Sequence, residues 1–113
     1  MLDHAVSSDF GKSWEVLEPC YLKKLIRNPQ LGYIDGIYVL YGRARLSHLV
    51  LYTSKYLTNW DSGTYVVYKE KFGAFYSNNL NLTDENKNFL LIQYSDAYDN
   101  NAKVNVMHTV SVE

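Results

Sequence analysis

Apolar residues along the chain follow two spacings, and the first is helical. Between residues 20 and 27, apolar positions recur at the interval of an amphipathic helix, with basic residues between them. Asn28-Pro29 ends this pattern, because the residue before a proline rarely adopts helical backbone angles. The spacing therefore predicts one short helix over 20–27. Residues 1–12 follow neither spacing and are expected to form a flexible lead-in.

Beyond Gly32 the spacing becomes that of β-strands. Five stretches rich in Tyr, Val, Ile and Leu are bounded by turn-forming residues, and the last alternates apolar and polar positions along its length. Residues 42–45 are expected to form a turn or a bulged link, and 58–63 and 99–101 to form loops. The polar, Asn-rich stretch 77–88 is expected to be a surface connection with one helical turn. The predicted strands are Ile37–Tyr41, Leu46–Thr53, Thr64–Glu70, Phe89–Tyr94 and Lys103–Val112.

Short links between these strands favour antiparallel neighbours over crossover connections. The predicted fold class is therefore α+β, with an antiparallel sheet of about five strands and one short amino-terminal helix. A partly closed small barrel is the alternative arrangement of the same strands. At 113 residues, the chain is expected to form a single domain over 1–113.

Composition narrows the class of protein. With 47% hydrophobic and 20% charged residues, the chain resembles an ordinary globular protein and not a disordered one. A single cysteine, Cys20, cannot form an internal disulfide, which favours a reducing compartment. Residues 1–20 lack a signal-peptide core, and no apolar run has the roughly 18 residues of a membrane span. We therefore expect a cytoplasmic protein without a membrane partner. Abundant Asn, Tyr and Lys suit the A+T-rich coding style of a phage or of a low-GC bacterium.

Charge is balanced overall but not along the chain. Residues 1–20 hold four acidic residues and one lysine, for a net charge of −3. Residues 21–71 hold eight basic and three acidic residues, for a net of +5, and residues 72–113 return to −3. A basic centre between acidic ends either pairs internally or presents a positive face.

Candidate catalytic and metal-ligating residues are few. His4, His48 and His108 lack the spacing of metal ligands. Phosphate-binding loops, nucleophile elbows and paired-cysteine motifs are absent from the sequence. No cofactor and no metal are therefore expected. A non-enzymatic protein is the favoured interpretation, and an enzyme without a recognisable motif is a lesser alternative.

Tyrosine is the most informative residue type. The chain has eleven tyrosines, and eight of them lie between Tyr33 and Tyr76. A core of this size cannot easily satisfy so many buried hydroxyls, so several rings are expected at the surface. Because Tyr, Trp and Arg dominate the energetics of interfaces, we expect a protein-binding, inhibitory or regulatory module. The expected contact residues are Trp60, Tyr56, Arg43, Arg45, Tyr41 and Tyr52.

The basic centre supports two further interpretations of the partner. Segment 41–71 interleaves basic and aromatic residues, which single-stranded nucleic acid needs for stacked bases and neutralised phosphates. The isoelectric point of about 6.3 is low for a dedicated nucleic-acid binder. Self-association through the edge of strand Lys103–Val112 would instead give a homodimer.

Overall fold

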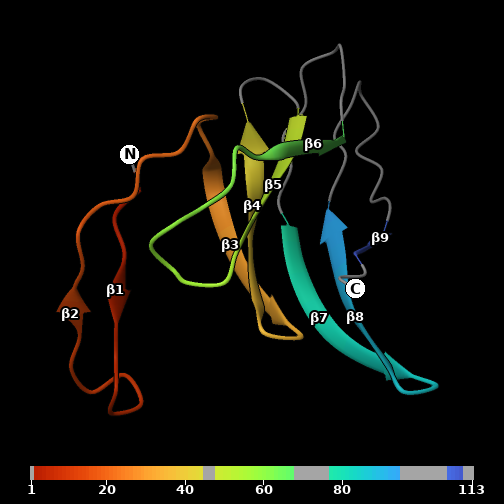
Figure 1. Cartoon of the computed structure of the whole chain (residues 1–113), viewed down its shortest axis with the longest axis horizontal. Coiled ribbons are helices and arrows are strands. Elements are labelled where there is room, and N and C mark those ends of the chain that lie inside the picture. The colour runs from red at the N-terminus through yellow and green to blue at the C-terminus, as the bar shows by residue number, and fades with distance from the viewer. Residues whose placement is uncertain (1, 45–47, 68–76, 95–106, 111–113) are drawn as a thin grey trace, which may run out of the picture.

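The computed structural model describes residues 2–44, 48–67, 77–94 and 107–110 of the 113-residue chain. The regular secondary structure in this part consists of β-strands alone (Figure 1). The strands are β1 (Ala5–Val6), β2 (Glu15–Val16), β3 (Arg27–Ile34), β4 (Ile37–Ala44), β5 (His48–Ser54), β6 (Thr64–Val67), β7 (Ser77–Asp84), β8 (Lys87–Tyr94) and β9 (Met107–Val110). They form three antiparallel sheets, with the orders β1-β2, β3-β4-β5-β6 and β7-β8-β9.

The predicted fold class is wrong, since the described residues contain no helix and three sheets replace the expected single sheet. The five predicted strands each overlap an observed one, but β1, β2, β3 and β7 were not predicted. Strand β3 contains Pro29, and β7 is polar and rich in asparagine. Neither segment has the composition that favours a strand, so pairing with a neighbouring strand determines the conformation of both. The expected loop at 99–101 lies outside the described residues.

The helix predicted over 20–27 is absent: the chain there is irregular, with a bend at Lys23 and Lys24, and β3 begins at Arg27. From Cys20 to Ile26, even-numbered residues are buried or half-buried and odd-numbered residues are exposed. Leu22 and Ile26 pack against the central sheet formed by β3 to β6. A separation of four residues fits a period of two as well as a period of 3.6. The apolar pattern was therefore ambiguous, and packing against the sheet selects the non-helical form.

Two tight turns set the register of the hairpins. Asp35 and Gly36 join β3 to β4 with φ angles of 48° and 80°, and Glu85 and Asn86 join β7 to β8 with φ angles of 47° and 64°. Two-residue loops with both φ angles positive match the right-handed twist of their strands. The prediction of a surface connection over 77–88 is therefore wrong, because this stretch forms β7, a turn and the start of β8. Residues 42–44, expected in a turn, belong to β4.

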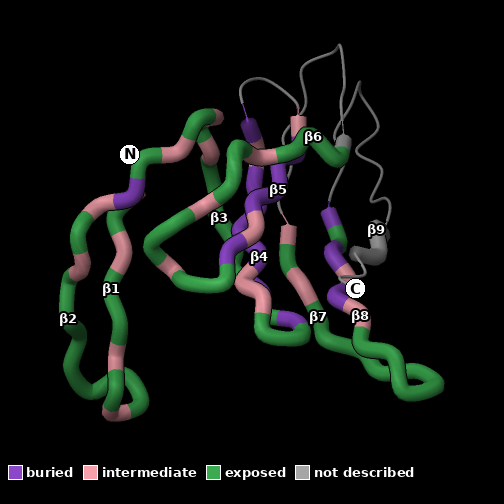
Figure 2. The backbone as a smooth tube through the Cα atoms, viewed as in Figure 1, coloured by how far each residue is buried: buried purple, intermediate pink, exposed green. Residues whose placement is uncertain are grey.

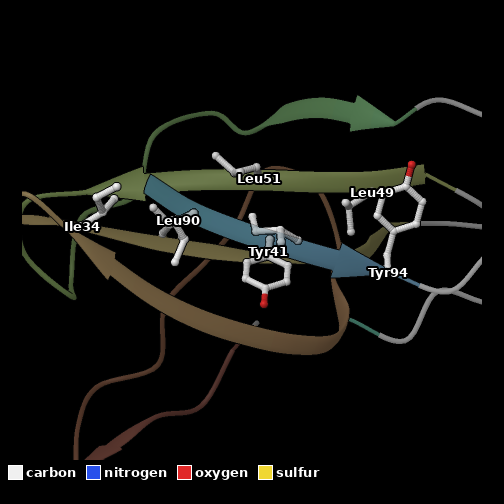
Figure 3. Close-up of a cluster of buried hydrophobic side chains, with 8 residues drawn as sticks. Ile34, Tyr41, Leu49, Leu51, Leu90 and Tyr94 are labelled. Atoms are coloured by element: carbon white, nitrogen blue, oxygen red, sulfur yellow. The ribbon is translucent and has the colours of Figure 1, made fainter. Parts of the chain in front are cut away.

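The central sheet is covered on both faces. Successive residues of β4 point to opposite faces, so Tyr41 joins one buried cluster and Leu40 joins another. Strand β8 covers the first face (Figure 3), and the segment before β3, together with Trp60, covers the second. The first cluster comprises Ile34, Val39, Tyr41, Leu49, Leu51, Leu90, Ile92 and Tyr94. The second comprises Leu40, Ala44, Val50 and Tyr52.

Asparagine side chains join β3 to the β7–β8 hairpin. Asn79 Nδ2 donates to the carbonyl oxygen of Leu31 at 3.1 Å and to the Tyr41 hydroxyl at 2.8 Å. Asn81 Nδ2 donates to the carbonyl oxygen of Tyr33 at 2.7 Å. Strand β3 is the edge of its sheet, so these amides satisfy carbonyl groups that strand pairing leaves open. The two sheets are thus connected by hydrogen bonds as well as by apolar packing.

Residues 3–19 form an arm that projects from the sheets (Figure 1). Its strands β1 and β2 pair with each other and are exposed along their length (Figure 2). The root of the arm is closed by two backbone hydrogen bonds between Leu2 and Cys20, of 2.7 and 2.8 Å. The arm therefore starts and ends at one point on the body of the protein.

Candidate functional site

The described tyrosines, apart from the half-buried Tyr38, divide into a buried and an exposed group. Tyr41, Tyr52 and Tyr94 are buried, whereas four others retain a third or more of their accessible surface. The exposed ones are Tyr21, Tyr33, Tyr56 and Tyr65. Tyrosine is therefore both a core residue and a surface residue in this protein, and the sequence pattern did not separate the two groups.

Tyr41 and Tyr52, expected at a contact surface, are instead fully buried. The Tyr52 hydroxyl donates to the carbonyl oxygen of Lys24 at 2.6 Å and accepts from the backbone N–H of the same residue at 2.7 Å. The Tyr41 hydroxyl accepts from Asn79. Burial raises the pKa of both phenols, although these hydrogen bonds act in the opposite direction. Both side chains hold layers of the fold together and are not accessible to a partner.

Of the remaining expected contact residues, Trp60 and Tyr56 line one open cavity beside Asp61, whereas Arg43 lies apart from them. Arg43 shares a face of β4 with Tyr41, whereas Trp60 packs on the opposite face, against the cluster that contains Leu40. Tyr56 is 70% exposed. Arg45 lies outside the described residues.

The loop that carries Trp60 was predicted correctly as a loop. Asp61 anchors it, because its backbone N–H donates to Thr53 and its carboxylate accepts from the Thr53 hydroxyl at 2.9 Å and the Gly63 N–H at 3.0 Å. Gly63 has a φ of 78°, and a Cβ there would lie 2.6 Å from the ring of Tyr52. The loop is therefore fitted closely over the second buried cluster.

Basic side chains of segment 41–71 form no continuous groove in the described residues. Arg43 is half-buried and Lys55 is exposed beyond the end of β5. Lys24 faces this segment, but its amino group donates to the carbonyl oxygens of Ser62 and Gly63, at 2.7 and 3.1 Å. The remaining cations of the segment, Arg45, Lys69 and Lys71, lie outside the described residues.

The tip of the arm is a hydrogen-bonded loop organised by Asp9. Its carboxylate accepts from the Ser7 hydroxyl at 2.8 Å and from the N–H and hydroxyl of Ser13 at 2.9 and 2.5 Å. The Gly11 N–H donates to the Ser7 hydroxyl at 2.8 Å. These bonds fix Phe10 and Gly11 at φ angles of 60° and 85°. A positive φ is unfavourable for an aromatic residue, so the hydrogen bonds of the loop hold Phe10 in this conformation.

Large apolar side chains on the arm face solvent. Phe10 at the tip is fully exposed, and Trp14 and Val16 are 63% and 78% exposed. The indole of Trp14 is held across the loop, because its Nε1 donates to the carbonyl oxygen of Gly11 at 3.2 Å. Apolar groups on an ordered, projecting element are typical of a surface that a partner covers.

Acidic residues surround these apolar groups. The segment 1–20 carries Asp3, Asp9, Glu15 and Glu18 against Lys12. Hydrogen bonds from Ser13 and Ser7 lower the pKa of Asp9 to about 2, so it remains charged at neutral pH. The arm therefore combines a fixed negative charge with exposed aromatic rings.

Within the described ranges, no group of three or more His, Cys, Asp or Glu side chains could hold a metal ion. The same part of the chain contains no helix long and apolar enough to cross a membrane. In comparisons with known proteins, no family model, no curated protein and no solved structure matched this chain. The site must therefore be interpreted from its own geometry.

The contact residues expected from the sequence lie in segment 41–60, and the exposed apolar side chains of the arm were not among them. One signal was present in the sequence: Phe10 and Trp14 stand among turn-forming and acidic residues, outside any apolar periodicity. An aromatic residue without apolar neighbours has no core to join and tends to stay at the surface.

Proposed function

We propose that the protein is a non-enzymatic protein-binding module that uses its arm as the recognition element. The observation that carries this proposal is the fully exposed ring of Phe10 at the tip of an ordered loop. A ring held in this way loses little conformational freedom on binding, so more of its burial energy is available for affinity. Trp14 and Val16 extend the apolar surface along the arm.

The chemistry of the arm specifies the kind of partner. Its excess of acidic residues favours a protein whose apolar cleft is flanked by Lys or Arg. The same charge disfavours an anionic lipid surface or a nucleic-acid backbone, because both would repel it. The proposed partner is therefore a different protein with a basic-rimmed apolar cleft that accepts Phe10.

The test compares arm variants with a matched surface variant. Phe10→Ser and Trp14→Ser remove rings from the arm, while Tyr56→Ser removes a ring from the body that is 70% exposed, slightly more than that of Trp14 at 63%. Proteins captured from the natural source by the wild type would be identified and purified, and their dissociation constants measured with each variant. We expect Phe10→Ser to weaken binding by about tenfold or more and Tyr56→Ser to change it by less than about twofold.

A second measurement varies the ionic strength. Affinity for the identified partner is expected to fall as salt rises, because charge attraction is screened. Equal binding by wild type and Phe10→Ser, or a loss seen only with Tyr56→Ser, would contradict the proposal. A Phe10-dependent dimer in sedimentation equilibrium, with no other protein bound, would also overturn it by making a second copy the partner.

A further inference from the structure

Strand β7 carries its apolar side chains on its outer face. Asn79 and Asn81 point towards the central sheet, because both donate to groups of β3 or β4. Leu80 and Leu82 alternate with these asparagines, so they point away from the central sheet. They are 58% and 43% exposed, and neither belongs to a buried cluster. The apolar side chains of β7 therefore play no part in the packing of the two clusters.

Pairing between the strands extends this apolar face onto β8. Leu80 lies opposite Leu91, and Leu82 lies opposite Phe89. Partners in an antiparallel pair point to the same face, so the four side chains form one surface, the hairpin patch. Leu91 and Phe89 are half-buried, and the residues that alternate with them in β8 belong to the first buried cluster. A contiguous group of large apolar side chains on an outer face is typical of a surface that a partner covers.

Two opposite charges at the end of the hairpin patch indicate what covers it. Asp84 lies opposite Lys87 beside the turn, and alternation along each strand places both side chains on the outer face. Both residues are exposed, and within the described ranges neither side chain has a hydrogen-bond or ion-pair partner. A partner surface of one charge sign would attract one of these residues and repel the other. A surface with the same two charges in exchanged positions fits both, and a second copy of the chain presents such a surface.

We propose that the protein forms a two-fold symmetric homodimer in which two hairpin patches pack face to face. A two-fold axis parallel to the strands places β7 of one copy over β8 of the other and keeps both turns at the same end. Asp84 of each copy then faces Lys87 of the other copy, and Leu82 faces Phe89. The patch is small for an interface, so we expect a weak dimer with a Kd of about 10–100 μM. The arm lies on the opposite side of the molecule (Figure 1), so this contact is independent of the arm's proposed partner.

The experiment measures self-association of the full chain by sedimentation equilibrium, up to about 300 μM. Asp84→Lys and Lys87→Asp each place like charges opposite one another across the proposed interface. Each variant alone should therefore associate about tenfold or more weakly than the wild type. An equimolar mixture of the two variants should recover most of the affinity, because opposite charges then face each other again. Like charges within each hairpin remain in the mixture, so recovery reports the contact between copies and not the stability of the hairpin.

A matched pair of leucine variants tests the apolar part of the patch. Leu82→Ser should weaken the dimer by about tenfold or more, whereas Leu25→Ser, at a position that is 72% exposed outside the hairpin patch, should not. Thermal unfolding checks that each variant is folded. A chain that stays monomeric at about 300 μM, or a mixture of the charge variants that does not recover affinity, would overturn the proposal. Equal association of Leu82→Ser and wild type, or a dimer that is lost with Phe10→Ser, would place the contact elsewhere and overturn it as well.

Discussion

Tyr52 shows how one hydroxyl group replaces local secondary structure. Its phenol pairs with both the N–H and the carbonyl oxygen of Lys24, 28 residues earlier in the chain. A helix over 20–27 would have bonded these groups locally. Without a helix, Lys24 takes both bonds from a residue of the sheet that its segment covers, which ties the second layer to the central one.

Replacement of Tyr52 by Phe is expected to destabilise the protein by about 1–3 kcal/mol, because both backbone groups of Lys24 lose their partner away from water. Urea unfolding measures this change in free energy. Tyr56→Phe is the matched control and should change stability by less than about 0.5 kcal/mol, since its ring is exposed. Similar effects of the two substitutions would show that the Tyr52 hydroxyl contributes little.

Asp9 makes the order of the arm depend on acidity. Its pKa is lowered from 3.8 to about 2, chiefly by the hydroxyl of Ser13. A lowered pKa means that the folded loop favours the charged carboxylate, so this contribution is complete above pH 3.8 and is lost as the pH falls through about 2. Carboxyl NMR titration should give this value. Ser13→Ala should move the pKa back towards 3.8, and an unchanged pKa would contradict the assigned cause.

Strand β3 exists because other elements complete its pairing. It is an edge strand that contains a proline, and Asn79 and Asn81 supply the donors that its outward carbonyl groups need. Gly32 allows the close approach, since a Cβ at this position would lie 2.8 Å from Leu90. The hairpin β7–β8 is thus placed by polar contacts at the edge and by apolar contacts on the face.

A change from Asn79 to Asp should destabilise the junction by about 1–3 kcal/mol, because a carboxylate cannot donate to Leu31 or Tyr41. The neighbouring Asn78→Asp introduces the same charge on the exposed side of β7 and should be nearly neutral. Chemical denaturation of both variants gives the comparison. Equal losses would mean that charge, and not the lost donor, is responsible.

Apolar periodicity predicted strands that are rich in apolar residues and missed strands that are polar or contain proline. The strands β4, β5 and β8 follow from runs of Val, Ile, Leu and Tyr, and the loop before Gly63 follows from its turn-forming residues. The strands β3 and β7 carry little such signal, because their stability comes from partners far away in the chain. The prediction of a helix over 20–27 was wrong for the same reason, because this segment packs against residues far away in the chain. Local spacing could not show which tyrosines the second layer would bury.

In the described part of the molecule, two layers pack on opposite faces of one sheet. Tyr41 and Leu40 are adjacent in β4, yet they belong to buried clusters on opposite faces. A strand that contributes to both clusters couples them, so the loss of one should loosen the other. The described part of the protein is therefore expected to unfold as a single cooperative unit.

Leu90→Ala tests this coupling. It removes apolar contacts on the β7–β8 side and should cost about 2–5 kcal/mol. Trp60 lies on the far face, so its fluorescence, measured in a Trp14→Phe background, reports the opposite layer. We expect the fluorescence and circular dichroism transitions to shift together. A Trp60 transition that kept its midpoint would show two independently unfolding layers.

The closed root of the arm has a consequence for engineering. Leu2 and Cys20 bring both ends of residues 3–19 to one place, and strands β1 and β2 join no other strand in the described chain. Foreign peptide sequences could therefore be grafted between Val6 and Glu15 without altering either interior cluster. The body would then serve as a display scaffold whose specificity is exchanged at one protruding ribbon.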